Sequence, residues 1–245
     1  MSYLQRLLGF NSSRFRLNQE NARFASEIPA GALVLDAGSG TSPYQALFRH
    51  AVYESADFEK VEKPYARSTY VCDLRSIPVD DARFDFILFN QVMEHLPEPA
   101  RALQELHRVL KPGGRMIYSG PLYYEEHEQP YDFYRYTRFG LRHLMTSAGF
   151  VVERLDWLEG YYGTVAYQLD GMARNLPVRP RHIGIGLPGY ALAPFMALLK
   201  IGCGAGSIFF HALETRTKFE MRGYPKNYVA VVSKSPRPLA TAQAA

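Results

Sequence analysis

The sequence predicts an α/β fold built on a doubly wound, mostly parallel β-sheet. Short apolar runs typical of buried strands alternate with amphipathic stretches of helical length. The first run, Leu33–Leu35, leads into Asp36 and a Gly38-Ser39-Gly40 turn, the strand–turn arrangement of nucleotide-type pockets. The strongest run, Phe84–Asn90, has the apolar composition of a central strand covered on both faces.

Local signals place the individual elements. Ser42 is a suitable helix N-cap and Pro43 a suitable first helical residue. Lys111–Gly114 ends the helix that starts near Ala100, because proline cannot continue a helix and glycine supplies the turn. Strands are expected at about 32–37, 51–57, 69–73, 83–90, 115–119, 150–155 and 228–232, and helices at about 43–50, 100–110 and 137–148.

The remaining segments surround this core. Residues 1–30 are expected to form a helical cap with Leu4, Leu7 and Leu8 on its apolar side, the alternative being a helix that touches a membrane. The predicted organisation is a cap at 1–30, a core at 31–158, a helical insertion at 159–226, a last strand at 227–234 and a disordered tail at 235–245.

Charge and cysteine usage bear on location and partners. From Arg174 to the end there are ten basic and two acidic residues, against eighteen and twenty-two before it, so the net charge of +4 hides a basic C-terminal third. Cys72 and Cys203 form no CxxC pattern, and the N-terminal segment lacks the continuous apolar core of a signal peptide. A cytoplasmic location is expected.

The glycine turn argues against a dinucleotide or a nucleoside triphosphate. The third glycine of the dinucleotide fingerprint is missing, no GxxxxGK[ST] motif occurs, and Asp36 would repel a nearby pyrophosphate. A ligand with a cationic centre and an amino group would instead be attracted to Asp36. Asp57 ends the second expected strand about 20 residues later, where a carboxylate meets ribose hydroxyls in Rossmann-like sites.

These residues resemble the motifs of class I methyltransferases that use S-adenosylmethionine (SAM), in particular the type 11 subgroup that includes quinone and glycan-cluster enzymes. The resemblance covers about residues 31–155. Its segments, in order, are Val34–Gly40, Asp73–Pro78, Phe84–Ile87 with Glu94–Leu96, Arg108–Arg115 and Ala148–Phe150. The resemblance implies a seven-stranded sheet with an antiparallel last strand.

The resemblance also implies roles for individual residues. Asp36, Gly38, Ser39 and Gly40 would surround the methionine part of SAM, to which Asn90 would contribute largely through its backbone. Asp57 would bind the ribose hydroxyls, and Phe58 would lie against the adenine. Asp73 and Leu74 would lie along the adenine edge. Taken singly, Asp57 and Asp73 are equally compatible with solvated acids at strand ends.

Two histidines are candidates for the acceptor side. A hydroxyl acceptor benefits from a general base, and His127 is the favoured candidate, with His95 and Asp132 as others. The alternatives are that His95 caps the next helix and that the aromatic residues of 121–137 form a packed lid. Because His127 has no second histidine at helical spacing, no metal site is predicted.

The segment 183–213 has one formal charge, Lys200. It is expected to form a helical pair packed on the sheet or over the pocket. The alternatives are a lipid-facing patch with basic flanks, or a membrane span, although Ile183–Leu199 is slightly short for a span and is interrupted by Pro194. Nucleic acid is not expected as a partner, because the basic residues accompany aliphatic residues rather than an aromatic platform.

The sequence thus predicts a SAM-dependent methyltransferase that acts on a hydroxyl of a glycan, a lipid-linked sugar or a similar small molecule. Methylation of a quinone or a phospholipid is the alternative within enzymes. A catalytically silent protein with this fold, acting as a scaffold, is the alternative outside them, and an NAD-dependent oxidoreductase is disfavoured by Asp36 and the missing glycine.

Overall fold

The computed structural model describes residues 11–184 and 187–236. The chain divides into two compact units. One unit comprises Leu17–Leu158 and Asn227–Ala245, and the other comprises Met1–Arg16 and Glu159–Lys226. The expectations for Leu4, Leu7, Leu8 and most of the tail lie outside the described residues.

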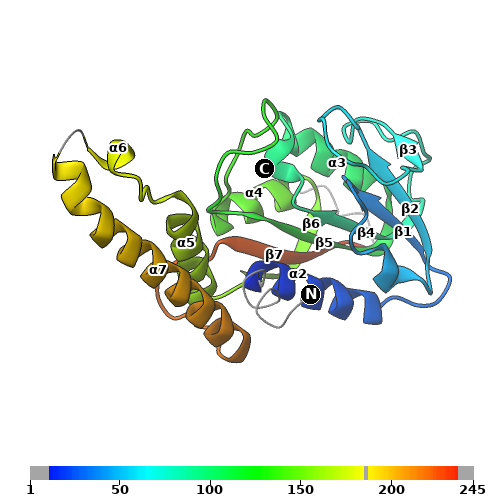
Figure 1. Cartoon of the computed structure of the whole chain (residues 1–245). Coiled ribbons are helices and arrows are strands. Elements are labelled where there is room, and N and C mark those ends of the chain that lie inside the picture. The colour runs from blue at the N-terminus through cyan, green and yellow to red at the C-terminus, as the bar shows by residue number, and fades with distance from the viewer. Residues whose placement is uncertain (1–10, 185–186, 237–245) are drawn as a thin grey trace, which may run out of the picture. The chain divides into compact units, whose positions relative to one another are not determined.

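The larger unit contains a seven-stranded sheet in the order β3-β2-β1-β4-β5-β7-β6 (Figure 1). All neighbouring strands are parallel except that β7 runs antiparallel to both β5 and β6. This confirms the expected class I methyltransferase topology. The strands are β1 (Leu33–Ala37), β2 (Val52–Asp57), β3 (Tyr70–Val71), β4 (Phe84–Asn90), β5 (Leu110–Pro121), β6 (Phe150–Trp157) and β7 (Asn227–Lys234).

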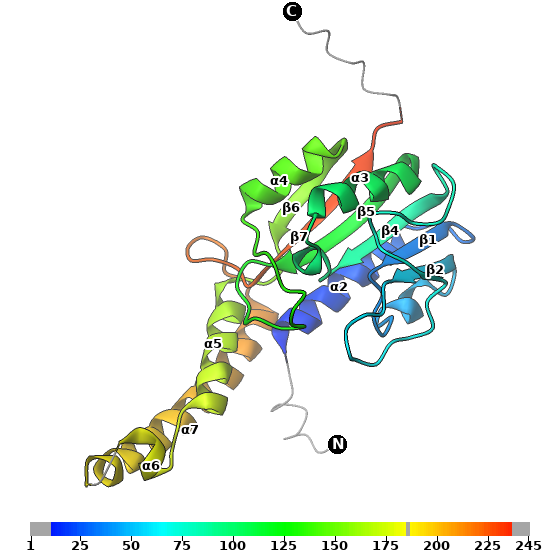
Figure 2. The same ribbon diagram turned by 90° about the horizontal axis from the view of Figure 1, so that it is seen from above.

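Helices cover both faces of this sheet (Figure 2). On one face, α3 (Pro99–Val109) and α4 (Arg138–Ser147) bury Leu103, Leu106 and Leu141 in the larger apolar cluster. On the other, α2 (Ser12–Ser26) contributes Phe24 to the second cluster. The central strand β4 supplies side chains to both clusters, which is why its sequence is apolar almost throughout.

Two local predictions for this unit need correction. The helix expected at 43–50 is a single 3-10 turn, η1 (Gln45–Phe48), and Ser42 has the left-handed φ of 51°, so it cannot serve as the N-cap. The fully buried ring of Phe48 anchors this short turn. The strand expected from residue 115 begins at Leu110, with a register shift between Phe84 and Phe86 that accommodates Lys111–Gly114.

The smaller unit contains α5 (Tyr161–Asn175), α6 (Pro180–Ile183) and α7 (Leu187–Arg216). The helix α7 continues through Pro194, so the expected interruption there is wrong. The buried Glu214 side chain of α7 accepts hydrogen bonds from the amides of Gly160 and Gly163, at 2.8 and 3.2 Å. This carboxylate therefore helps to satisfy the N–H groups at the start of α5, where Gly163 also donates to the Gly160 carbonyl oxygen at 3.1 Å.

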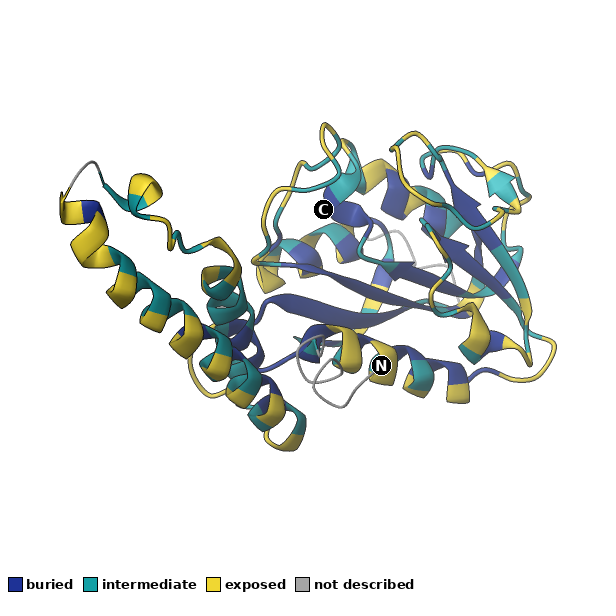
Figure 3. Ribbon diagram, in the orientation of Figure 1, coloured by how far each residue is buried: buried dark blue, intermediate teal, exposed yellow. Residues whose placement is uncertain are grey.

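Much of the α7 surface is exposed (Figure 3). By length and composition, α7 is the one helix of the described residues that could cross a membrane. Its buried positions include Cys203, Ser207 and His211, and the Ser207 hydroxyl donates to the carbonyl oxygen of Ala166 in α5. One face of α7 thus packs on α5, whereas its apolar residues on other faces are exposed.

Candidate active site

The turn after β1 depends on glycine at one position. Gly38 has φ +77°, and a Cβ built on it would lie 2.4 Å from a methyl group of Val92. Its amide donates to the carbonyl oxygen of Ala56 at 2.7 Å, which ties the turn to β2. Any side chain at position 38 would therefore strain the backbone and collide with Val92.

Asp57 connects this turn with the chain after β2. Its carboxylate accepts hydrogen bonds from the amides of Gly40, at 2.8 Å, and Glu59, at 3.1 Å. Each carboxylate oxygen has further lone pairs, so the group can still accept hydrogen bonds from a ligand. The next residue, Phe58, packs edge-on against Tyr131 with ring centroids 5.4 Å apart.

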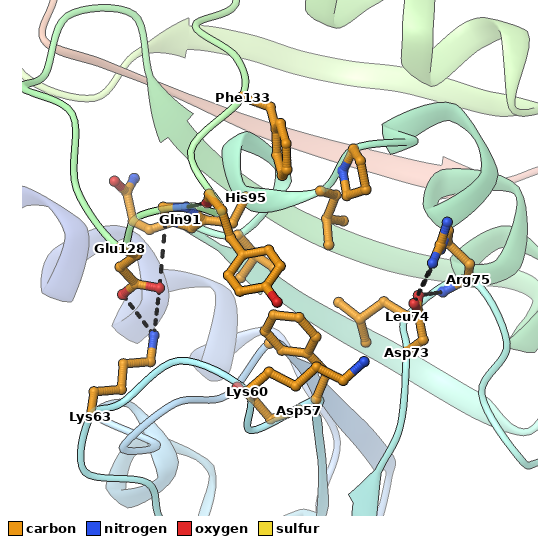
Figure 4. A pocket seen from close by; sticks show the side chains of 16 residues that line it. Asp57, Lys60, Lys63, Asp73, Leu74, Arg75, Gln91, His95, Glu128 and Phe133 are labelled. Carbon is orange, nitrogen blue, oxygen red and sulfur yellow. Dashed lines mark hydrogen bonds and ion pairs between the residues drawn. The ribbon is translucent and has the colours of Figure 1, made fainter.

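A pocket opens at this edge of the sheet, with about 840 Å³ of empty space (Figure 4). Of the predicted cofactor residues, Gly38, Asp57, Phe58, Asp73 and Leu74 line it. The others, namely Asp36, Ser39, Gly40 and Asn90, are not among its lining residues.

Asp36 is buried and does not line the pocket. Its carboxylate is 4% exposed and accepts a hydrogen bond from the Tyr53 hydroxyl. Burial, the largest effect, raises the pKa of Asp36 from 3.8 to about 6; the Tyr53 hydrogen bond opposes this rise, and the nearby charge of Asp57 adds to it. Tyr53 is thus a partner that the sequence analysis did not identify.

The side chains of two further predicted residues form hydrogen bonds within the protein. The Asp73 carboxylate accepts hydrogen bonds from the Arg75 guanidinium, which holds the Asp73 pKa below its usual value. The Asn90 side chain donates to Asn21 and accepts from Ser119. The side-chain amide of Asn90 is therefore occupied by protein partners. This is compatible with a contribution to ligand binding through the backbone of Asn90 alone.

The pocket lining also includes residues that sequence reasoning missed. Lys63 and Glu128 form an ion pair at 2.6 Å, and Lys60, Gln91 and Phe133 also line the pocket (Figure 4). Lys60 and Lys63 follow β2, Arg75 follows β3, and Glu128 follows β5. No local pattern in the sequence brings these segments together.

His95 lines the pocket, and the His127 ring packs against the His95 ring. The two imidazole rings are T-shaped, with centroids 4.6 Å apart. The His95 Nδ1 atom is 2.6 Å from the carbonyl oxygen of Tyr131. Burial, as the largest effect, lowers the pKa of His95, which favours the neutral ring.

Asp132 does not face the pocket as a free base. Its carboxylate forms a two-pronged ion pair with Arg135, at 2.6 and 2.8 Å, and accepts a hydrogen bond from the His127 amide at 2.9 Å. The Arg135 hydrogen bonds, as the largest effect, hold the pKa of Asp132 far below its usual range. Asp132 therefore positions the His127 segment.

Glu94 completes this cluster. Its carboxylate is fully buried, and neither oxygen has a hydrogen-bond partner among the described residues. Burial raises the Glu94 pKa to about 8. The sequence analysis placed Glu94 in a motif without a role.

Comparisons with known proteins identify the family. Residues 10–155 match the family model described as "Methyltransferase domain". A malonyl-[acyl-carrier protein] O-methyltransferase of Herminiimonas arsenicoxydans is 40% identical over 111 residues, which are 41% of this chain and 42% of that protein. A tRNA (carboxymethyluridine(34)-5-O)-methyltransferase of Arabidopsis thaliana is 30% identical over 115 residues, 44% of this chain and 28% of that protein. The chain thus spans less than half the length of these relatives.

A solved structure shares the fold. Phosphoethanolamine N-methyltransferase 2 of Haemonchus contortus, in complex with phosphomonomethylethanolamine and S-adenosylhomocysteine, aligns with a TM-score of 0.53 at 14% identity. The alignment covers 90% of this chain and 52% of that one. Because the family model matches more than half of the chain, the chain belongs to the methyltransferase domain family. The expected class I methyltransferase with SAM as its cofactor is confirmed.

The raised Asp36 pKa predicts a pH-dependent stability. The native state holds this proton more tightly than the unfolded chain, so the free energy of unfolding falls as the pH rises from about 4 to about 6. The loss is about 3 kcal/mol, at about 1.4 kcal/mol per pKa unit. We expect Asp36→Asn, which keeps an acceptor for Tyr53, to remove this loss in urea unfolding curves at pH about 4 and about 7.

The exposed Asp80 provides a control, because Asp80→Asn should leave the pH dependence as in the wild type. An equal stability difference between Asp36→Asn and the wild type at both pH values would contradict the assignment.

Proposed function

We propose that this methyltransferase transfers the methyl group of SAM to a hydroxyl group of a small amphiphilic acceptor, such as a lipid-linked sugar or a glycan. The observation that carries the proposal is the pocket that joins Asp57 on one side to His95 on the other. The first side suits a nucleoside with ribose hydroxyls, and the second offers polar groups to an acceptor that loses a proton.

The residues around the glycine turn suit the cofactor. Gly38 and Gly40 leave the turn without side chains, and the buried Ser39 hydroxyl oxygen has no hydrogen-bond partner among the described residues. We propose that Asp57 accepts hydrogen bonds from the ribose hydroxyls, and that Phe58 and Leu74 contact the adenine. When bound, SAM supplies a methyl group on a cationic sulfonium. We propose that the buried Asp36 contributes indirectly, because its carboxylate accepts the hydrogen bond of the Tyr53 hydroxyl.

The acceptor side is built to align a substrate and to exclude water. Tyr131 and Phe133 line the pocket from the loop after β5, and the Phe133 amide donates to the backbone oxygen of Glu94 at 2.9 Å. Methyl transfer requires alignment of the acceptor with the methyl group more than it requires covalent chemistry by the protein. We propose that the cluster of His95 and His127 accepts the proton that the acceptor hydroxyl loses. Asp132 is a positioning residue for the His127 segment.

The cofactor role of Asp57 can be tested by binding alone. We expect Asp57→Ala to weaken SAM binding in calorimetric titration by at least about tenfold, because a hydrogen bond to a charged group contributes about 1.5–3 kcal/mol. The control variant is Asp80→Ala, which changes an exposed carboxylate away from the pocket lining. Equal affinity of the two variants for SAM would show that Asp57 has no such role.

The acceptor class is tested with SAM carrying a labelled methyl group and detergent-solubilised envelope lipids. We expect the label in a lipid-linked sugar fraction, in an ether that survives mild base, and its loss with Asp57→Ala. Label released by mild base would indicate a carboxyl ester, and label in quinones or amine headgroups would favour the alternative acceptors. Each of these results would contradict the hydroxyl proposal.

Two further outcomes concern other classes of function. Transfer to tRNA would place the acceptor in the class of the Arabidopsis relative, against our expectation of no nucleic-acid partner. SAM binding without transfer to any extract would favour a catalytically silent scaffold.

We also propose that α7 holds the protein peripherally at the cytoplasmic face of a membrane. Large apolar side chains of α7 are exposed, among them Phe195 at 62%, Leu198 at 69% and Ile201 at 69%. Arginines flank the helix on both sides in the sequence, where they would meet anionic headgroups. Such an anchor would bring an amphiphilic acceptor to the enzyme.

Vesicle sedimentation tests this anchor. We expect the wild type to sediment with phosphatidylcholine vesicles that contain phosphatidylglycerol, and the double variant Phe195→Glu, Leu198→Glu to bind at least about tenfold more weakly, since burial of each apolar side chain contributes about 1.5–3 kcal/mol. Phe139→Glu, at an exposed phenylalanine of α4, is the matched control and should sediment like the wild type. Equal sedimentation of all three proteins would remove α7 from this role.

A further inference from the structure

Three side chains with metal-binding atoms meet beside the pocket. Glu94 and His95 come from the short turn η2 (Met93–His95) after β4, and His127 comes from the loop after β5. One ligand atom from each residue lies within 4.8 Å of the other two. Two imidazoles and a carboxylate are the donor set of several mononuclear sites for zinc and related metals.

Both histidines are oriented through one ring nitrogen. The His95 Nδ1 atom lies 2.6 Å from the Tyr131 carbonyl oxygen. The His127 Nδ1 atom lies 3.2 Å from the Glu125 carbonyl oxygen and 3.4 Å from Asp132 Oδ2. An acceptor at Nδ1 keeps the proton there and leaves Nε2 with a free lone pair, as is common for metal-binding histidines.

Glu94 supplies the independent observation. Its side chain is 0% exposed, and neither carboxylate oxygen has a hydrogen-bond partner among the described residues. Its Oε1 atom is 3.9 Å from His95 Nε2. A buried carboxylate without a partner is costly, and a cation held by Glu94 and the two histidines would satisfy it.

We propose that Glu94, His95 and His127 bind one divalent transition-metal ion of the zinc class. With the ion bound, the two imidazoles are its ligands, and they are available as a base for the acceptor hydroxyl only in the metal-free protein. Ligand atoms about 2.1 Å from a tetrahedral metal lie about 3.4 Å from one another, so side-chain rotations that close the present separations suffice. Three protein ligands leave one position for a water or substrate oxygen, and His95 belongs to the pocket wall. Mg²⁺ is a poorer match, because it prefers oxygen ligands.

The site does not depend on which acceptor the enzyme methylates, so it is tested without turnover. Protein freed of metal by chelation is titrated with Zn²⁺ against a chromophoric chelator, and with Co²⁺ while the visible absorption is recorded. We expect one Zn²⁺ per chain, the intense visible bands of four-coordinate Co²⁺, and a raised melting temperature with Zn²⁺.

Variants identify the ligands. Glu94→Gln and His127→Ala should each weaken Zn²⁺ binding by at least about 100-fold, since loss even of groups that only orient ligands costs about 10–100-fold. His143→Ala, at an exposed histidine of α4, should bind like the wild type. The metal-free melting temperature of each variant shows whether it is folded, and unchanged SAM affinity shows that its cofactor site is intact.

Two results would overturn the proposal. One is a wild-type chain that binds no Zn²⁺ while it still binds SAM. The other is equal Zn²⁺ affinity in His127→Ala, Glu94→Gln and His143→Ala, which would assign binding to surface groups. Loss of SAM binding in the wild type would instead count against the cofactor site, so the two failures are distinguishable.

Discussion

The carboxylate of Asp57 is the interaction on which the cofactor pocket depends. It accepts hydrogen bonds from the amides of Gly40 and Glu59, and so joins the turn after β1 to the chain after β2. The turn can adopt this path only because Gly38 tolerates a left-handed φ and close contact with Val92. Sheet order then places β4, which leads to the acceptor side, directly beside β1.

The acceptor side depends on the segment after β4. The backbone oxygen of Glu94 receives the Phe133 amide, and the Tyr136 hydroxyl donates to the oxygen of Met93 at 3.2 Å. These bonds hold the loop after β5 against the pocket. The Asp132–Arg135 ion pair stiffens the same loop, because the Asp132 side chain is 4% exposed and its charge is compensated. The loop thereby places the His127 ring against the His95 ring.

The helical unit combines buried polar contacts with an exposed apolar helix surface. Within it, the Glu214 carboxylate accepts hydrogen bonds from amides at the start of α5, and the Ser207 hydroxyl donates to the carbonyl oxygen of Ala166. The exposed surface of α7 is apolar instead. Large contiguous apolar patches on protein surfaces commonly mark interaction sites, and this supports the proposed contact of α7 with an amphiphile or a bilayer.

The sequence alone determined where the strands lie in the chain, the glycine turn and the acids at the ends of β1 and β2, because these features are encoded by local periodicity and by residues close in the chain. Tertiary structure decided the rest. Asp36 turns to Tyr53 because β1 and β2 pair in register, α7 continues through Pro194 while packed on α5, and His95 meets His127 only through the loop after β5. Spacing along the chain could not reveal the histidine cluster, since its members are brought together by hydrogen bonds between separate segments.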